Sequence, residues 1–172
     1  IEKVRGLLRK SPPEMQPLHV NEIIREALVL SENALQRSRI AVHTELVADG
    51  SLVRVDRVQL QQVMLNLILN AIEAMSSVVD RPRTLIIRSL KTSDGLAIQV
   101  QDTGTGLAPE QMGRIFEPFF TTKPQGIGMG LSIARSIVEA HGGRLWVTPG
   151  PLHGSVFQFT LPAQEGCNER AA

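Results

Sequence analysis

Polar side chains form a stripe through an otherwise apolar segment of the sequence. Asn66, Asn70 and Glu73 continue a series that begins with Gln59 and Gln62, at spacings of three or four residues. In a helix these spacings put all five on one side, because each residue turns the chain by about 100°. The amide oxygen of Asn70 is a hard ligand of the kind that Mg²⁺ prefers when it also binds phosphates. The stripe therefore predicts a polar wall suited to a metal-bound phosphate.

Two glycine-rich segments supply groups that a nucleotide needs. They are Asp102-Thr103-Gly104-Thr105-Gly106 and Gly126-Ile127-Gly128-Met129-Gly130-Leu131. Glycines let backbone N–H groups approach a phosphate closely, and the second segment lies where a helix is predicted to begin, which favours anions. The carboxylate of Asp102 can accept a hydrogen bond from an exocyclic amine such as that of adenine. Together with the stripe, the two segments predict a nucleotide-binding pocket.

Each motif taken alone has a more ordinary explanation. A GxGxG segment is often only a turn, Asp102 could cap a turn, and Asn66 and Asn70 could be structural. A Rossmann dinucleotide loop needs a strand directly before its glycines, whereas Gly126 follows Thr-Thr-Lys-Pro-Gln. The sequence has no Walker A segment of the form GxxxxGKS or GxxxxGKT. Only the combination of the three motifs points to a nucleotide.

The hydrophobic pattern predicts single helices between pairs of strands. Asn21 is expected to cap a helix of about 16 residues. Further helices are expected over 56–77 and 127–141, and strands over 40–47, 52–55, 85–90, 96–102, 144–148 and 155–161. Residues 103–126 are expected to be a loop with a short helix at 109–111. This order predicts an α/β two-layer sandwich, with a mixed, mostly antiparallel sheet and the helices on one face.

Two of these strands carry specific expectations. In the strand over 96–102, Asp102 shares the alternation of Leu96, Ile98 and Val100, so its carboxylate is predicted to point toward the covered face of the sheet. The strand over 40–47 alternates apolar and polar residues and is therefore predicted to be half-buried. Asp49-Gly50 is predicted to form the turn that follows it.

Composition excludes several classes of protein. Eighteen Lys and Arg residues against 17 Asp and Glu give a net charge of +1, with no sustained basic run of the kind that binds nucleic acid. Aromatic residues are only 3% of the chain, which disfavours stacking platforms for single strands. The single cysteine, Cys167, excludes an internal disulfide and a cysteine-based zinc site. No apolar run approaches the roughly 18 residues of a membrane span.

The motifs and their order resemble the catalytic ATP-binding domain of bacterial sensor histidine kinases, in the wider group of Hsp90, gyrase and MutL ATPases. Four segments are similar to that family's asparagine, first glycine, phenylalanine and second glycine boxes: 62–71, 102–106, 116–120 and 126–131. His141-Gly142-Gly143 and Gly154-Ser155-Val156-Phe157 match the usual end of the domain. The likeness covers about residues 12–162 and implies a Bergerat-type ATP-binding fold. The amino-acid sequences of segments 70–75 and 119–123 are most similar to those of nitrogen-regulation and oxygen-sensor kinases.

The resemblance implies ATP and Mg²⁺ as ligands. Asn70 would coordinate Mg²⁺, Asn66 would support a phosphate or the metal, and Asp102 would bind the adenine amino group. The other implied nucleotide contacts are Gly104, Gly106, Lys123, Gly126, Gly128, Gly130 and Leu131. For Lys123 the alternative is a solvated surface lysine. Residues 107–126 would form a lid that orders when nucleotide binds.

The sequence departs from its relatives at two positions of the asparagine box. Many histidine kinases have a basic residue three positions after the metal asparagine, where this chain has Glu73. Glu73 would either orient metal-bound water or merely end the polar stripe. The ATPase relatives have a general-base glutamate four residues before that asparagine, where this chain has Asn66. An amide cannot accept a proton from water, which favours phosphoryl transfer over hydrolysis.

The histidines do not supply a phosphate acceptor, because His19, His43, His141 and His153 match no acceptor motif of the family. The resemblance therefore implies transfer of the γ-phosphate to a histidine on an upstream dimerisation domain, followed by relay to a response regulator receiver domain. The alternatives are a serine kinase of the anti-sigma-factor type and a nucleotide-sensing module without catalysis. ATP and ADP are the expected ligands, with no nucleic acid and no membrane contact by these residues. A cytoplasmic location is expected, with a full-length protein that could be membrane-anchored.

The domain boundaries are set by prolines. Ile1, Val4, Leu7 and Leu8 have helical spacing, which stops at Ser11-Pro12-Pro13. Residues 1–11 are therefore expected to be the stump of an upstream dimerisation helix and 12–162 the catalytic domain. Residues 163–172 are expected to be a disordered tail.

Overall fold

A computed structural model describes residues 12–48 and 52–164 of the chain. The expected helix stump over 1–11, the predicted Asp49-Gly50 turn and Cys167 lie outside the described residues. The elements are β1 (Gln16–His19), α2 (Val20–Arg37), β2 (Ala41–Glu45), β3 (Leu52–Val55), α3 (Arg57–Met75), β4 (Thr84–Thr92), β5 (Gly95–Asp102), α4 (Pro109–Met112), α5 (Gly130–Ala140), β6 (Leu145–Pro149) and β7 (Ser155–Pro162). Within these residues no helix is both long and apolar enough to cross a membrane.

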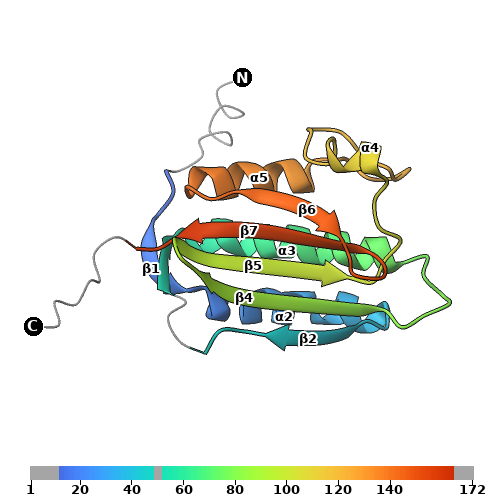
Figure 1. The fold of residues 1–172 in the computed structure, drawn as a ribbon, viewed down its shortest axis with the longest axis horizontal. Helices are drawn as coiled ribbons and strands as arrows, with labels where there is room; N and C mark the ends of the chain where they lie inside the picture. The colour runs from blue at the N-terminus through green and yellow to red at the C-terminus, as the bar shows by residue number, and fades with distance from the viewer. Residues whose placement is uncertain (1–11, 49–51, 165–172) are drawn as a thin grey trace, which may run out of the picture.

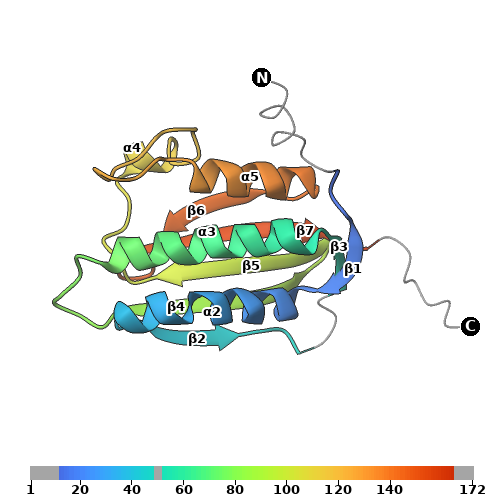
Figure 2. The same ribbon diagram turned by 180° about the vertical axis from the view of Figure 1, so that it is seen from behind.

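The elements form two layers, as predicted. Five strands make one sheet in the order β2-β4-β5-β7-β6, and α2, α3 and α5 lie side by side on one of its faces (Figures 1 and 2). Only β2 and β4 run parallel, and the other neighbours are antiparallel. The prediction of a mixed, mostly antiparallel sheet with helices on one face is therefore confirmed.

The core lies between α3 and the central strands. Leu60, Met64, Leu67 and Ile68 of α3 are almost completely buried, as is Phe159 of β7. Burial of such side chains contributes roughly 1.5–3 kcal/mol each, which holds α3 firmly over the sheet. The polar stripe of α3 is consequently fixed in position relative to the end of β5.

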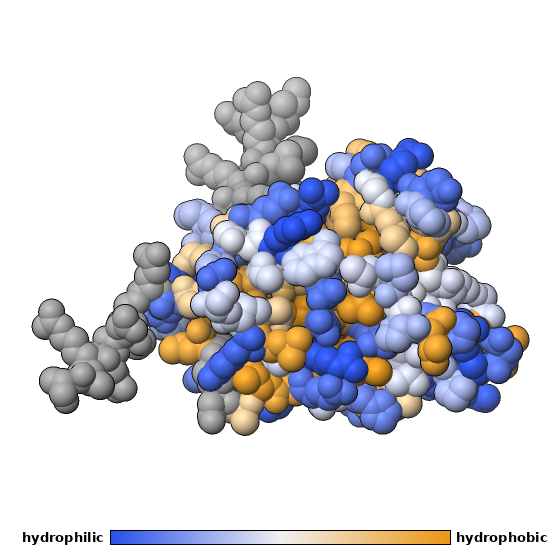
Figure 3. Space-filling model, in the orientation of Figure 1, coloured by the Kyte–Doolittle hydropathy of each residue, from blue (hydrophilic) through white to orange (hydrophobic). Residues whose placement is uncertain are grey.

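The opposite face of the sheet carries a ladder of polar side chains. Arg88 donates to Glu45 at 2.7 Å and to Gln101 at 2.8 Å, and Gln99 donates to Gln158 at 2.9 Å. Figure 3 shows polar and apolar residues intermixed over this side of the molecule. The ladder explains how a single layer of helices is enough, because this face satisfies its own polar groups beside solvent.

Two features of the N-terminal half differ from the predictions. Every residue of β2 is exposed, Val42 by 37%, rather than alternately buried, because β2 is the edge strand of the sheet. The structure also has a strand that was not predicted, β1, which pairs with β3 in a separate two-stranded sheet. β1 leads directly into α2, so the helix begins before Asn21, and His19 stands at its N-cap without a side-chain cap.

The prediction that Asn21 caps a helix is therefore wrong. Asn21 is 7% exposed and donates to the carbonyl oxygen of Val47 at 2.7 Å. Its side-chain oxygen accepts from the Ser89 hydroxyl at 2.8 Å, and that hydroxyl oxygen accepts from the Val47 N–H at 2.9 Å. These three residues form a satisfied buried polar network that ties α2 to β4, which explains a polar residue at a core position.

The N-terminus of α3 is fixed by Asp56, which is the N-cap of the helix. Its carboxylate accepts from the backbone N–H groups of Gln59 at 2.9 Å and Glu14 at 2.7 Å. Burial alone would raise the pKa of Asp56, but these backbone hydrogen bonds hold it below its usual value. The Asp56 N–H donates to Nε2 of the buried His141 at 3.0 Å. His141 thus has a structural role, joining the start of α3 to the end of α5.

Candidate functional site

A cavity of about 640 Å³ lies between α3, the end of β5 and the segment that leads into α5. Most of the residues singled out in the sequence line it: Asn66, Asn70, Glu73, Asp102, Gly106, Lys123, Gly126, Gly128, Gly130 and Leu131. Gly104 does not line the cavity and lies behind Asp102 instead. Apolar contacts come from Leu107, Ile115, Phe120, Ile133 and Phe157. The cavity combines an apolar floor with a few convergent polar groups, as small-molecule sites do.

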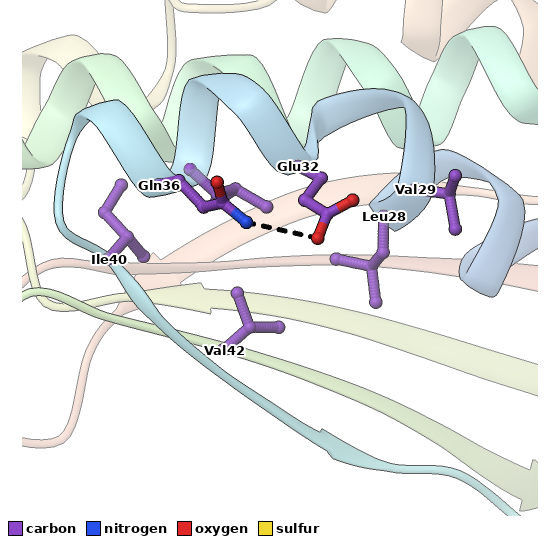
Figure 4. Close-up of a pocket in the computed structure, with 7 residues that line it drawn as sticks. Leu28, Val29, Glu32, Gln36, Ile40 and Val42 are labelled. Carbon is purple, nitrogen blue, oxygen red and sulfur yellow. Dashed lines mark hydrogen bonds between the residues drawn. The ribbon is translucent and has the colours of Figure 1, made fainter.

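A second cavity, of about 420 Å³, lies between α2 and β2 and has a different character (Figure 4). Leu28, Val29 and Val42 contribute to its apolar walls. Its polar side chains pair with each other, since Gln36 donates to Glu32 at 3.1 Å. None of the motifs reaches this cavity, so the site of interest is the larger one.

Asn66 and Asn70 occupy different environments on α3. The amide nitrogen of Asn66 donates to the carbonyl oxygen of Gly130 at 2.9 Å, which joins α3 to the first residue of α5. None of the hydrogen bonds found among residues 12–48 and 52–164 involves the side chain of Asn70. Asn70 therefore faces the cavity with its amide oxygen available to a ligand.

Asp102 is the most deeply buried carboxylate at the site, with 1% of its surface exposed. The alternation in β5 places it on the covered face, as predicted. Oδ1 accepts from the Gly104 N–H at 2.8 Å. Burial raises the pKa of Asp102 to about 6, against the opposing effect of the Gly104 and Ser155 N–H groups and of Lys123. This carboxylate is fixed on one side by the backbone and lines the cavity on the other.

Glycines make room for Asp102 on both sides. A Cβ at Gly104 would lie 2.5 Å from the Ala74 carbonyl oxygen and 2.7 Å from Oδ1 of Asp102. Gly154 has φ +73°, and a Cβ there would lie 2.1 Å from the Asp102 carbonyl oxygen. The Thr105 N–H donates to the Ala74 carbonyl oxygen at 3.2 Å, so the loop also lies directly against α3. The first glycine segment is therefore required for close packing around the carboxylate.

The second glycine segment does not begin the helix where the sequence suggested. The prediction of a helix from residue 127 is wrong, because Gly128 has φ +73° and α5 starts at Gly130. The Gly128 carbonyl oxygen accepts from the Phe119 N–H at 2.9 Å. This bond folds the segment back on itself beside the cavity. The predicted short helix in the preceding loop is present as α4.

The phenylalanines of the 107–126 segment divide into two groups. Phe116 packs edge-on against Phe157, with ring centroids 6.2 Å apart, and Phe120 lies under the Arg114 guanidinium at 4.5 Å. Phe119 is instead 73% exposed, and the nearby Ile127 is 76% exposed. The segment is thus anchored by two aromatic rings, whereas Phe119 is exposed, as is Ile127 at the edge of the cavity just after the segment.

An ion pair between Glu73 and Lys123 links α3 to the 107–126 segment across the edge of the cavity. Glu73 therefore has a partner, and Lys123 is partly covered rather than freely solvated. Lys123 also lies close enough to Asp102 to lower its pKa. A cation that is paired with Glu73 and lies near Asp102 at the cavity is suitably placed to meet phosphate.

The oxygens of Asn70 and Glu73 fit Mg²⁺ as ligands. The residues that the structure describes contain no cluster of three His, Cys, Asp or Glu side chains able to cage a metal. Mg²⁺ is usually bound through one or two protein ligands together with substrate phosphates and water. The Asn70 amide, with the Glu73 carboxylate one helical turn further on, matches that sparse donor set.

Arg81 is a residue of the site that the sequence patterns did not reveal. It contacts the backbone carbonyls of Thr103 and Gly104, directly behind Asp102. No periodicity marks an arginine in a loop that binds main-chain oxygens, so no signal in the sequence could have found it. Ser155, which contributes its N–H to Asp102, was noted only as part of the C-terminal motif.

The chain matches the family described as histidine kinase-, DNA gyrase B- and HSP90-like ATPases over residues 55–165. It is 40% identical over 94% of its length to the sensor protein TdiS of Thauera aromatica and covers 30% of that protein. It is 37% identical over 96% of its length to the sensor protein FixL of Bradyrhizobium diazoefficiens and covers 32% of it. The chain thus spans about a third of the length of these relatives.

Solved structures agree with this assignment. The nucleotide-free catalytic domain of histidine kinase ThkA is 37% identical, with a TM-score of 0.78 over 87% of this chain and 95% of that one. ThkA in complex with the response regulator protein TrrA has a TM-score of 0.76 at 31% identity, covering 94% of this chain and 45% of that one. The chain therefore belongs to the family of histidine kinase-, DNA gyrase B- and HSP90-like ATPases and is a histidine kinase ATP-binding catalytic domain.

Proposed function

We propose that this domain binds Mg-ATP in the cavity beside α3 and presents the γ-phosphate to a histidine on another domain of the same protein. That phosphate then passes to an aspartate of a response regulator receiver domain. The observation that carries this proposal is the lining of one cavity by both a buried carboxylate, Asp102, and the amides of Asn66 and Asn70. The first suits a base with an exocyclic amine, and the amides suit a metal-bound phosphate.

Different residues of the cavity bind different parts of the nucleotide. Asp102 accepts a hydrogen bond from the adenine amino group, and Gly106 leaves space beside the base. Asn70 is the protein ligand of Mg²⁺, and Asn66 supports the phosphates. Mg²⁺ neutralises phosphate charge when bound. The remaining proposed contacts, around the phosphates at the start of α5, are Lys123, Gly126, Gly128, Gly130 and Leu131.

Glu73 and Lys123 connect metal and phosphate in this scheme. When nucleotide binds, the phosphates compete with Glu73 for the Lys123 ammonium group. The released carboxylate would then be free to hold water of a bound Mg²⁺. This choice follows from the ion pair, because a side chain that merely ended the polar stripe would need no partner on the lid.

The cavity is better suited to phosphoryl transfer than to hydrolysis. The position four residues before Asn70 is an amide, Asn66, whose nitrogen donates to Gly130 and which cannot accept a proton from water. Of the carboxylates that line the cavity, Asp102 is buried at the base end and Glu73 is paired with Lys123. In the ion-paired arrangement of this structure, neither carboxylate is placed as a general base for water.

The comparisons favour a histidine acceptor over the two alternatives, a serine acceptor and a purely sensory role. TdiS and FixL are sensor proteins, and ThkA is a histidine kinase whose structure includes a response regulator. Because ATP and receiver domains are cytoplasmic, we place this activity in the cytoplasm.

The test supplies the missing acceptor. Purified chain with radiolabelled Mg-ATP is expected to show no labelling of itself and to release phosphate far more slowly than the roughly 1 s⁻¹ of ordinary enzymes. It is expected to label a separately added helical domain that carries the acceptor histidine, and not the same domain with that histidine replaced by glutamine. Phosphate release at about 1 s⁻¹ or faster, or equal labelling of both domains, would contradict the proposal.

A further inference from the structure

Arg81 holds the loop behind Asp102 through two neighbouring carbonyl groups. Its Nε donates to the Thr103 oxygen at 3.2 Å, and its terminal nitrogen donates to the Gly104 oxygen at 2.8 Å. The Arg81 side chain is only 23% exposed. A planar guanidinium can contact two acceptors at once in a fixed geometry, which a flexible ammonium group cannot do.

The position of these carbonyls gives the contact its significance. The Thr103 carbonyl and the Gly104 N–H belong to one peptide group. Arg81 donates to the oxygen of that peptide group, and the Gly104 N–H of the same group donates to Oδ1 of Asp102 at 2.8 Å. Hydrogen bonds in such a chain polarise one another, so the guanidinium charge strengthens the bond that fixes the Asp102 carboxylate.

From this geometry we propose that Arg81 is a positioning residue for base recognition. It orients the Thr103–Gly104 peptide so that Asp102 stays in place with an oxygen free for the nucleotide. This inference rests on the proposed role of Asp102 as the adenine acceptor.

Other contacts hold the ends of the loop but leave this peptide to Arg81. The Thr103 hydroxyl accepts from the Thr84 N–H at 2.9 Å and donates to the Pro82 oxygen at 3.0 Å. The Thr105 N–H donates to the Ala74 oxygen at 3.2 Å. Among the described residues, Arg81 is the side chain that contacts the carbonyl oxygens of Thr103 and Gly104. Its loss would free the peptide while the loop remained attached.

Arg83 provides a matched control from the same loop. It also donates to three backbone carbonyls, those of Val78 at 2.9 Å, Ser38 at 2.9 Å and Ser76 at 3.1 Å. These bonds join the end of α3 to the end of α2, and none of them contacts Asp102 or its loop. Replacing Arg83 therefore removes a comparable set of hydrogen bonds without touching the base end of the cavity.

The charged groups around Asp102 define what a pH profile would report. Lys123 faces it from the lid and is paired with Glu73 of α3. Asp80 pairs with Arg81 at 3.1 Å on the exposed side of the loop. Ionised Asp102 is a stronger acceptor for an amine than the protonated acid, so ATP affinity should fall as pH drops through the pKa of Asp102. A weaker Gly104 hydrogen bond raises that pKa and moves the fall to higher pH.

The experiment compares Arg81→Gln, Arg81→Lys and Arg83→Gln with the wild-type chain. Calorimetric titration with Mg-ATP and Mg-GTP from pH 5 to 8 gives affinity, base selectivity and the pH midpoint. Urea denaturation gives stability. The phosphates of ATP titrate identically for every variant, so differences between variants report the protein.

Arg81→Gln is expected to lose about tenfold in ATP affinity at pH 7, with little change for GTP, and to shift the pH midpoint upward. Arg83→Gln is expected to lower stability while keeping both the ATP-to-GTP ratio and the midpoint. Should Arg81→Gln not fold, Arg81→Lys is expected to show at least part of the same loss of selectivity.

Two results overturn the inference in different ways. If the wild type prefers ATP over GTP and the Arg81 variants keep both that preference and the pH midpoint of ATP binding, Arg81 is only structural. Equal affinity of the wild type for ATP and GTP shows that Asp102 does not read the base, and both the inference and the proposed base recognition fail together.

Discussion

Replacing Gly104 with alanine is expected to lower the free energy of unfolding by about 3 kcal/mol and to prevent ATP binding. The added methyl group would lie 2.5 Å from the carbonyl oxygen of Ala74 and 2.7 Å from Oδ1 of Asp102. Neither neighbouring oxygen can move away easily, because the Ala74 carbonyl belongs to the backbone of the central helix α3 and the Asp102 side chain is buried. The loop must therefore shift, which breaks the hydrogen bond that positions the carboxylate.

Gly113 provides the control for the Gly104 substitution. A Cβ there meets nothing within 4 Å, so Gly113→Ala is expected to leave stability and ATP affinity nearly unchanged. Urea denaturation and calorimetry of both variants check the comparison. An unfolding midpoint and an ATP affinity at Gly104→Ala equal to those of the wild type would mean that the loop does not pack as described.

Asp102→Asn is expected to change how stability depends on pH. Burial raises the pKa of Asp102 from 3.8 to about 6 in the folded state. The folded state therefore binds the proton more tightly than the unfolded state, and the contribution to stability is complete below about pH 3.8 and lost as pH rises through about 6. The full change is on the order of 3 kcal/mol. Asparagine, which does not titrate, lacks this loss.

The comparison uses urea denaturation of both proteins between pH 4 and 7. The advantage of Asp102→Asn over the wild type should grow by on the order of 2 kcal/mol across this range, while its ATP affinity at pH 7 is lower. Asp56 and Glu45, whose pKa values are lowered, titrate equally in both proteins and cancel. A stability difference that stays constant with pH would show that the buried carboxylate carries no such penalty.

The sequence predicted the parts of the site that depend on periodicity. The spacing from Asn66 to Glu73 placed the stripe on one side of a helix, and alternation in β5 turned Asp102 inward. Both are confirmed, because a regular helix and a central strand leave little freedom for their side chains. The sheet and its single layer of helices followed from the same patterns.

What the sequence missed depends on tertiary contacts. Asn21 is a residue type that often caps helices. The helix instead starts at Val20, directly after β1, and the Asn21 amide is buried with Val47 and Ser89 as its partners. Helical spacing around Gly128 could not show that its backbone is left-handed. Arg81 acts on main-chain oxygens far along the sequence, and such contacts leave no trace in a hydrophobic pattern.

The central claim, that the cavity beside α3 is an adenine-nucleotide site, is tested most directly by calorimetric titration of the purified chain with ATP and GTP, each with and without Mg²⁺. We expect ATP to bind at least about tenfold more tightly than GTP, since GTP offers a carbonyl where Asp102 needs a donor. We also expect removal of Mg²⁺ to weaken ATP binding. Equal affinities for the two nucleotides, or no binding of either, would contradict the claim.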